Sequence, residues 1–170
     1  MKEYFDIVDK NDKVIGRALR SECHSNPKLI HRGVFVIVIN EGKILLQRRG
    51  MKADTNPGKW EFMGEHNKVG ESYRKAAIRG LKEELGINQK VKKIAKMKIS
   101  SRRETEFDEI HVCKVSGKIR INFNKKEVKE VKSFTLKEIE RLMKKNPRMF
   151  SSWSVKVLNN CKSVLSNDYF

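Results

Sequence analysis

Two adjacent glutamates, Glu83 and Glu84, lie in a segment whose apolar pattern predicts a helix. At 3.6 residues per turn, Ile78, Leu81 and Leu85 fall on one side and can pack on a core, while positions 80, 83 and 84 project from another side. Neighbouring carboxylates repel each other unless a cation lies between them, and carboxylate oxygens are ligands that Mg²⁺ prefers. The segment therefore predicts a site for Mg²⁺ or Mn²⁺ held by Glu83 and Glu84.

Two glycines occur in this helix, which we expect over about residues 71–86. Gly86 is expected to end it, because glycine readily adopts the left-handed conformation of a helix C-terminus. Gly80 lies in the interior, where glycine costs about 1 kcal/mol relative to alanine. Two interpretations of Gly80 stay open, a decayed catalytic position or a space kept clear for a bulky ligand.

The surrounding segments predict a single domain over residues 1–170. Two further helices are expected at about 135–145 and 152–165, with N-caps at Thr135 and at Ser151 or Ser152. Strands on both sides of the acidic helix, followed by helices, indicate an α+β fold, an α/β/α sandwich with a mixed central sheet and flanking helices. The expected strands are Tyr4–Val8, Val14–Leu19, Val34–Ile39, Ile44–Gln47, Ile94–Ser100, Glu109–Val115 and Val128–Phe134.

The composition excludes several classes of protein. A chain of 170 residues with 38% apolar and 35% charged residues is typical of one soluble domain. Its longest apolar run, Val34–Ile39, is far shorter than the roughly 20 residues that span a membrane, and the N-terminus has no apolar signal segment. We therefore expect a cytoplasmic protein with no membrane partner. Cys23, Cys113 and Cys161 are widely spaced, which indicates neither a disulfide framework nor a zinc ribbon.

The formal net charge of +17 favours polyanionic ligands such as diphosphates, nucleotides or RNA. The lysines are spread along the chain, and between Lys90 and Lys98 several alternate with apolar residues, as in a half-buried strand with a basic solvent face. No aromatic-rich motif accompanies the charge. We therefore favour a small diphosphate over nucleic acid as the partner, and the oligomeric state stays open between monomer and homodimer.

The segment ESYRKAAIRGLKEELGI resembles the signature of the Nudix superfamily, which is Gly, five residues, Glu, seven residues and Arg-Glu-apolar-x-Glu-Glu-x-Gly-apolar. Gly80 stands where the signature has the Glu after its Arg, and Glu65 stands where it has the opening Gly unless one residue is inserted after Gly64. The resemblance implies the Nudix fold, a divalent metal on the helix and hydrolysis of a diphosphate linkage in a nucleoside or isoprenoid diphosphate derivative. The matching positions are Glu71, Arg79, Leu81, Glu83, Glu84, Gly86 and Ile87.

A wider resemblance covers nearly the whole chain and is carried by HRGVFVIVINEGKILLQRR, PGKW and FSSW. These segments look like the type I isopentenyl diphosphate isomerases and the hydrolases grouped with them. In those isomerases, two histidines seven residues apart and a third just before the box bind a metal with a carboxylate from a later strand. The resemblance implies this role for His24, His31, His66 and Glu109, a set that suits Zn²⁺ or Mn²⁺.

The two reactions of this subgroup need different groups. The isomerases use a Cys just before the third His together with a Glu, but the stretch Phe62–His66 has no thiol, and Glu65 is the local candidate for a proton donor. Hydrolysis needs a metal site, which Glu83 and Glu84 can supply, and a base, for which Glu109, Glu65 or a metal-activated water can serve. We therefore favour a hydrolase. The alternatives are an isopentenyl diphosphate isomerase and a catalytically impaired Nudix-fold binding module.

Basic and aromatic side chains near the expected site can hold the substrate. Arg79 and Glu71 are expected to brace the loop against the helix through a charged hydrogen bond, and Trp153 can form a wall of the pocket. The expected phosphate contacts are Arg48, Arg49, Lys52 and Lys59.

Overall fold

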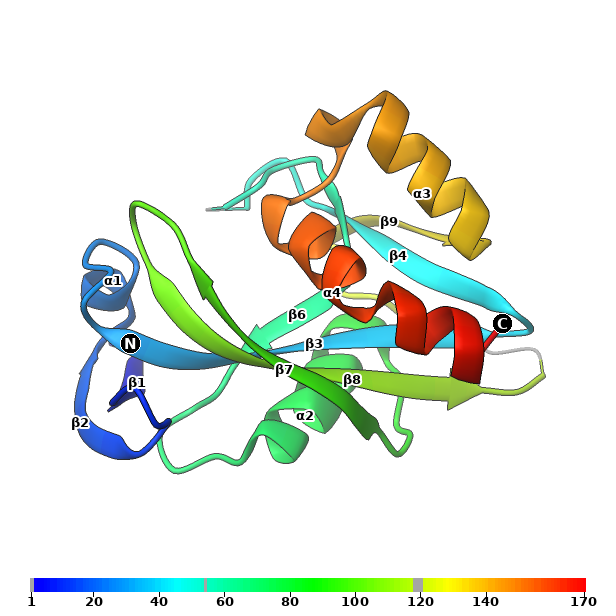
Figure 1. Ribbon diagram of the computed structural model, residues 1–170. Helices are drawn as coiled ribbons and strands as arrows, with labels where there is room; N and C mark the ends of the chain where they lie inside the picture. The colour runs from blue at the N-terminus through cyan, green and yellow to red at the C-terminus, as the bar shows by residue number, and fades with distance from the viewer. Residues whose placement is uncertain (1, 54, 118–120) are drawn as a thin grey trace.

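The structure is a computed structural model in which a seven-stranded sheet lies between two helical layers (Figure 1). It describes residues 2–53, 55–117 and 121–170. Helix α2 (Tyr73–Leu85) covers one face of the sheet. Helices α3 (Leu136–Lys145) and α4 (Ser152–Asp168) pack on the other face. The arrangement confirms the predicted α+β fold, with a mixed central sheet and flanking helices.

Strands β3 and β8 form the centre of the sheet. β3 (Ile30–Asn40) and β8 (Thr105–Val115) are parallel along their whole length, and His31 lies opposite Glu106 in this register. β7 (Lys92–Ser100) pairs with the outer edge of β8. β8 begins four residues before Glu109, where the strand was expected to begin. Glu106 and Asp108 therefore lie within this central strand, and Glu104 lies directly before it.

Two antiparallel strands share the other edge of β3. β4 (Lys43–Arg49) pairs with the last residues of β3, whereas β6 (Met63–His66) pairs with its first half. Two short or peripheral strands, β5 (Trp60–Glu61) and β9 (Val128–Phe134), pair with β4. Because β4 and β6 leave the same edge at different points, they diverge away from β3.

The apolar run of β3 is buried on both faces of the sheet. Successive side chains of a strand point to opposite faces, so the odd-numbered residues from Phe35 to Ile39 pack toward α3 and α4, and the even-numbered residues from Val34 to Val38 pack toward α2. A strand covered on both faces carries no alternation of apolar and polar residues. This burial explains why its sequence shows a continuous apolar run.

The N-terminal residues form a separate two-stranded sheet, β1 (Tyr4–Val8) with β2 (Val14–Leu19), as predicted. A short helix that the sequence did not indicate, α1 (Arg20–Cys23), follows it. Figure 1 shows this unit, drawn in blue, beside the first half of β3. Its turn is fixed there because Asp12 accepts hydrogen bonds from Arg32 Nε at 2.6 Å and from the Tyr73 hydroxyl at 2.9 Å.

The caps of the main helices follow the predicted chemistry. Ser72 accepts a hydrogen bond from the backbone of Lys75 at the start of α2, and Gly86 ends that helix in the left-handed conformation with φ of 68°. Thr135 and Ser151 cap α3 and α4 in the same way. α4 continues three residues beyond the expected end at position 165, and a 3₁₀ turn, Pro147–Met149, precedes it.

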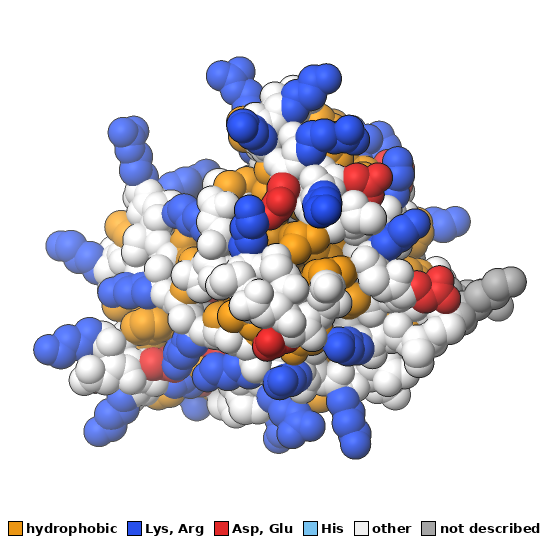
Figure 2. Space-filling view, turned by 45° about the vertical axis from the view of Figure 1, so that its right-hand side comes forward, with side chains coloured by type: hydrophobic (Ala, Val, Ile, Leu, Met, Phe, Trp, Pro, Cys, Tyr) orange, Lys and Arg blue, Asp and Glu red, His pale blue; other side chains and the backbone are white. Residues whose placement is uncertain are grey.

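The positive charge is distributed over the surface. On the face drawn in Figure 2, Lys and Arg side chains project in many directions and do not gather into one patch. This distribution agrees with the expectation of dispersed solvent-facing lysines. Among the described helices, none is long and apolar enough to cross a membrane.

Arg79 connects α2 to the loop that precedes it through hydrogen bonds. Its guanidinium donates two hydrogen bonds to Glu71, at 3.0 and 2.9 Å, and one to the carbonyl oxygen of His66 at 2.8 Å. It donates a further bond to Glu65 Oε2 at 2.8 Å. Only 17% of the Arg79 side chain is exposed, so these charge-assisted bonds are partly shielded from water. The predicted brace between Arg79 and Glu71 is present.

We expect Arg79→Lys to lower the free energy of unfolding by about 2–3 kcal/mol, because one ammonium group cannot satisfy acceptors arranged around a planar fork. Urea unfolding followed by circular dichroism would measure the change. The control is Lys75→Ala on the exposed side of α2, for which we expect a change within about 0.5 kcal/mol. Equal stability of Arg79→Lys and the wild type would contradict the brace.

Candidate active site

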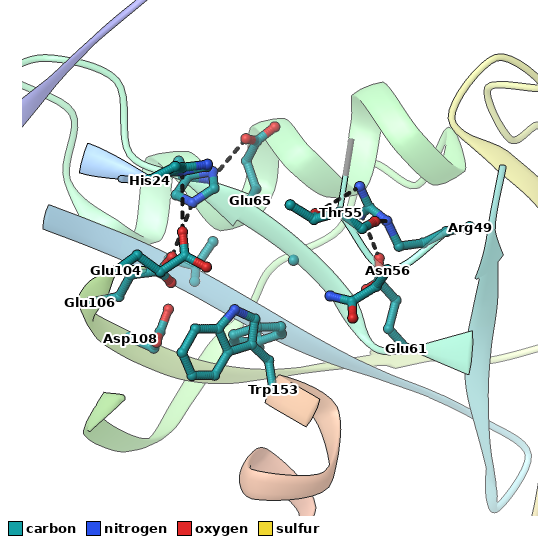
Figure 3. A pocket seen from close by; sticks show the side chains of 14 residues that line it. His24, Arg49, Thr55, Asn56, Glu61, Glu65, Glu104, Glu106, Asp108 and Trp153 are labelled. Atoms are coloured by element: carbon teal, nitrogen blue, oxygen red, sulfur yellow. Dashed lines mark hydrogen bonds and ion pairs between the residues drawn. The ribbon is translucent and has the colours of Figure 1, made fainter. Parts of the chain in front are cut away.

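A cleft with a cavity volume of about 70 Å³ lies where β4 and β6 diverge. Figure 3 shows its two ends, with His24, Glu104 and Glu106 at one side and Arg49, Asn56 and Glu61 at the other. Trp153, at the start of α4, lies between the two ends. The cleft therefore brings together side chains that are far apart in the sequence.

Three histidine rings converge at one end of the cleft. The ring centroids of His24, His31 and His66 lie 4.9–5.5 Å from one another. Each of these rings offers a nitrogen within 4.8 Å of the others and of a carboxylate oxygen of Glu106. The rings come from three different elements: His24 follows α1, His31 is on β3 and His66 ends β6. The convergence predicted from the spacing of the three histidines is therefore present.

Phe5 of the N-terminal hairpin covers this histidine group. Its ring is stacked on His31 with a centroid distance of 5.3 Å and on His66 with a centroid distance of 4.8 Å. Phe5 is fully buried, so it excludes water from one side of the rings and limits their rotation. The hairpin thus forms a wall of the candidate site, a role that nothing in its sequence indicated.

Two members of the group, His24 and Glu106, have the protonation state of metal ligands, whereas at His66 the effect of burial is outweighed by the bond and charge of Glu106, which raise the pKa of that ring. Burial, together with the neighbouring rings of His66 and His31, lowers the pKa of His24 to about 4, so that ring is neutral near pH 7. Burial of Glu106 is outweighed by its bonds from His31 and His66, which hold the pKa of that carboxyl well below its usual range. Neutral imidazole and ionised carboxylate are the forms that bind a metal.

Glu106, rather than Glu109, completes the histidine group. Successive β8 side chains alternate between the faces of the sheet, and the register opposite His31 puts Glu106 on the face of the histidines. Glu109 lies on the opposite face, where Lys93 Nζ donates to it at 2.7 Å. The expectation for Glu109 is therefore corrected by the register of β8, which begins earlier than the sequence indicated.

Asp108 is a cleft residue that sequence reasoning left out of the site. It lies two residues after Glu106 on the same face of β8, is fully buried and lines the cleft. Neither of its carboxylate oxygens has a hydrogen-bond partner within the described residues. Burial and the nearby charge of Glu106 raise the pKa of Asp108 well above its usual value. The spacing of two acids at i and i+2 on one strand was the signal that could have found it.

Glu84 lies at the α2 side of the sheet, in a group with Gln47 and Glu61. Gln47 Nε2 donates to Glu84 Oε2 at 2.5 Å and reaches Glu61 Oε1 at 3.4 Å. Burial, together with the charges of Glu61 and Glu65, raises the pKa of Glu84 to about 8. Glu61 lines the cleft and receives a hydrogen bond from Arg49 Nη1 at 2.8 Å.

The two glutamates of the helix differ in environment. Glu84 is 7% exposed, whereas the side chain of Glu83 is 52% exposed and forms ion pairs with Arg79 and Lys68 on the outer surface. Glu83 does not line the cleft, and Glu84 reaches it only through Gln47 and Glu61. Of the two glutamates, Glu84 is the one that is buried and linked to the cleft by hydrogen bonds.

Some of the residues expected to bind the substrate line the cleft, and others lie outside it. Arg49 and Trp153 line the cleft. Arg48 turns away, donating to the carbonyl oxygen of Gly58 at 2.9 Å, and Lys52 lines a separate surface hollow. Lys59 is not among the residues that line the cleft. The cleft thus retains one of the four basic side chains expected to contact phosphate.

The donor atoms on the two sides of the sheet suit different metals. Within the described residues, the Nε2 atoms of His24 and His31 are buried without a well-formed hydrogen bond, which fits imidazole ligands of Zn²⁺ or Mn²⁺. On the other side, Glu84 and Glu61 are brought together by Gln47 Nε2, and their carboxylate oxygens fit a cation that takes oxygen ligands, such as Mg²⁺. Both sets of residues fit the metals that the sequence predicts.

Comparisons with known proteins agree with this fold. An isopentenyl-diphosphate delta-isomerase of Photorhabdus laumondii is 29% identical over 94% of this chain and 92% of that protein. An uncharacterized Nudix hydrolase of Streptomyces coelicolor is 41% identical, over 49% of this chain and 47% of that protein. A crystal structure of a Deinococcus radiodurans protein superposes with a TM-score of 0.79 at 18% identity, covering 94% of this chain and 99% of that one.

The acidic helix, the strands around it and most of the residues that line the cleft fall within one matched stretch of sequence, which His24 precedes. The family model for the NUDIX domain matches residues 29–154, which include β3, α2, β8 and the start of α4. The match covers most of the chain and extends across the centre of the described fold. This protein therefore belongs to the Nudix family.

Proposed function

We propose that this protein is a divalent-metal-dependent hydrolase that cleaves a diphosphate linkage in a small nucleoside or isoprenoid diphosphate derivative. The observation that carries the proposal is the buried Glu84, held by Gln47 beside the cleft residue Glu61 and within a Nudix helix. The net charge of +17 also favours an anionic substrate. The basic side chain at this end, Arg49, is placed to contact a phosphate oxygen of a bound substrate.

Glu84 and Glu61 would hold Mg²⁺ or Mn²⁺ at the α2 side of the cleft, with water and phosphate oxygens as the remaining ligands. When bound, the metal would neutralise phosphate charge and lower the pKa of a coordinated water. Glu65 lines the same cleft, on the strand that lies against α2. Trp153 offers an aromatic face that can pack against the apolar or planar part of the substrate.

His24, His31, His66 and Glu106 would hold a second metal, Zn²⁺ or Mn²⁺, at the other end of the cleft. These residues lie on the face of the sheet opposite Glu84, and the cleft connects the two ends. A substrate in the cleft would then contact both groups. We therefore assign the histidine end to binding and orienting the substrate, and the Glu84 end to the diphosphate.

Isopentenyl diphosphate isomerisation is the second candidate, because relatives with that name align over nearly the whole chain and the histidine group is formed. This reaction needs one group to protonate the double bond and another to remove a proton. The stretch Phe62–His66 has no thiol, and burial raises the pKa of Cys23, Cys113 and Cys161 to about 11. None of these cysteines lines the cleft. An isomerase would have to use a carboxyl group of the cleft, either Glu65 or the buried Asp108, whose oxygens have no partner within the described residues.

We expect Glu84→Gln to lower Mg²⁺-dependent hydrolysis by about a hundredfold or more, because a neutral amide replaces an anionic ligand. Glu83→Gln, which changes an exposed side chain, should lower hydrolysis less. Nucleoside and isoprenoid diphosphates serve as substrates, and NMR follows phosphate release and the position of the double bond. Full activity in both variants would contradict the metal site, and movement of the double bond without phosphate release would favour the isomerase.

The same variant should change the pH dependence of stability in metal-free protein. The raised pKa of Glu84 means that folding favours its protonated form, so its contribution is lost as the pH rises from 4.5 to about 8. Glu84→Gln stays neutral, so its stability relative to the wild type should rise by up to about 1.4 kcal/mol per pH unit over that range. Urea unfolding with a chelator at pH 5, 6.5 and 8 would measure this, and a constant difference would contradict the buried state of Glu84.

Loss of one ring should lower the metal content of the protein. We expect His66→Ala, whose side chain is partly exposed, to retain less than one equivalent of Zn²⁺ or Mn²⁺ by elemental analysis after dialysis. The matched control is His111→Gln, because His111 is buried on the other face of β8 and outside the histidine group. Metal content that is unchanged in His66→Ala, or already absent in the wild type, would contradict the second site.

A further inference from the structure

Strand β6 lies so close to α2 that positions 65 and 80 occupy one space. A Cβ atom placed on Gly80 would lie 2.9 Å from the Cβ of Glu65 and 3.2 Å from its Cγ. It would also lie 2.9 Å from the Sδ atom of Met63. Real Cβ atoms do not approach other atoms this closely, so a side chain at position 80 would displace Glu65 or Met63. The space beside Gly80 is therefore filled by the protein and is not free for a ligand.

These two positions exchange the residue types of the Nudix signature. The signature has glycine at the position of Glu65 and glutamate at the position of Gly80. Because the two positions face each other across one small space, only one of them can carry a long side chain. The chain has thus kept one glycine and one glutamate, and the glutamate extends from the strand instead of the helix.

The carboxylate of Glu65 lies between Arg79 and the backbone of His66 and lines the cleft. Its Oε2 accepts a hydrogen bond from Arg79 Nη1 at 2.8 Å, and its Oε1 accepts one from the backbone of His66 at 2.8 Å. Glu65 lines the cleft together with Glu61, and both lie near enough to Glu84 for their charges to act on it. Each carboxylate oxygen of Glu65 has a second lone pair that these bonds do not use.

We propose that Glu65 supplies from β6 the carboxylate that α2 lacks at position 80, and that Glu65 and Glu84 together bind the divalent cation. The inference rests on the proposed function, since it names a further ligand for the same metal. Gln47 Nε2, which donates to Glu84 Oε2 at 2.5 Å and reaches Glu61 Oε1 at 3.4 Å, holds two carboxylates of this group close together. With Glu65 included, the site has the carboxylates from both β6 and α2 that a phosphate-bound Mg²⁺ needs.

A purely structural role is the alternative for Glu65, because it also pairs with Arg79. Glu71 provides the matched control. It receives two hydrogen bonds from the same guanidinium, at 3.0 and 2.9 Å, but it does not line the cleft. If Glu65 acted only by holding Arg79, then Glu71→Gln would affect the cation as strongly as a change at position 65.

The experiment follows the unfolding temperature as a function of Mg²⁺ concentration, since a ligand that binds the folded state raises this temperature in a saturable way. Loss of a residue with a purely structural role lowers the unfolding temperature at every Mg²⁺ concentration. Loss of a metal ligand instead raises the Mg²⁺ concentration at the midpoint of the curve. We expect Glu65→Gln and Glu65→Gly to raise the midpoint by about 10–100-fold. Glu71→Gln should lower the unfolding temperature at every Mg²⁺ concentration and leave the midpoint in place.

The reciprocal variant tests the exchange itself. In Glu65→Gly/Gly80→Glu, removal of the Glu65 side chain clears the space, and the flexible Met63 can move aside. We expect this double variant to recover the wild-type midpoint to within about threefold, an allowance for imperfect placement of the new ligand. Gly80→Glu alone should lower the unfolding temperature, because both glutamates then compete for one space.

The outcomes separate the two proposals. If the Mg²⁺ midpoint shifts in Glu84→Gln but stays at the wild-type value in Glu65→Gln and Glu65→Gly, the role of Glu65 is overturned and the metal site stands. An equal midpoint shift in Glu71→Gln, a folded double variant without recovery, or full stability of Gly80→Glu also overturns it. A wild type that shows no Mg²⁺ response even with inorganic pyrophosphate overturns the proposed function as well. If the double variant does not fold, the nearly isosteric Glu65→Gln decides the result.

Discussion

The parallel pairing of β3 with β8 is the constraint on which the cleft depends. It sets His31 opposite Glu106 and Gly33 opposite Asp108, so that imidazole and carboxylate groups meet on one face of the sheet. Gly33 leaves room for these acids, since a Cβ there would lie 3.1 Å from Glu106 Oε2 and closer still to Asp108. A shift of one residue would turn every β8 side chain to the other face and replace Glu106 by Phe107 or Thr105.

The divergence of β4 and β6 from β3 has an electrostatic consequence. It opens the sheet where carboxylates approach from both faces, with Glu106 and Asp108 on one side and Glu61 and Glu84 on the other. Buried acids are costly unless they are paired or neutralised. The histidines compensate Glu106, but Arg49 offsets the burial of Glu61 only in part, so burial raises the pKa of Asp108 on one side and of Glu61 and Glu84 on the other. A pair of bound cations would relieve both, which is the physical link between this fold and metal chemistry.

The family does not by itself select the reaction. Relatives that align over nearly the whole chain are named as isomerases, whereas a relative that aligns over half of it is a Nudix hydrolase. Function on a shared fold depends on the groups at the site. Here Gly64 offers no thiol, and the three cysteines are buried away from the cleft, while Glu84 stays beside Glu61. These residues, rather than the fold, are the basis for favouring hydrolysis.

The sequence by itself determined the features that depend on neighbouring residues. Periodicity placed α2, glycine chemistry ended it at Gly86, and the hairpin at Asp12 followed from local turn residues. The spacing of the three histidines indicated their convergence, because it matches a known family pattern. Only the tertiary structure decided that Glu106 completes that group, that Glu84 is buried while Glu83 is exposed, and that Glu65 fills the space beside Gly80. Strand register and the distance between β6 and α2 fix these features, and both are set by contacts between residues far apart in the chain.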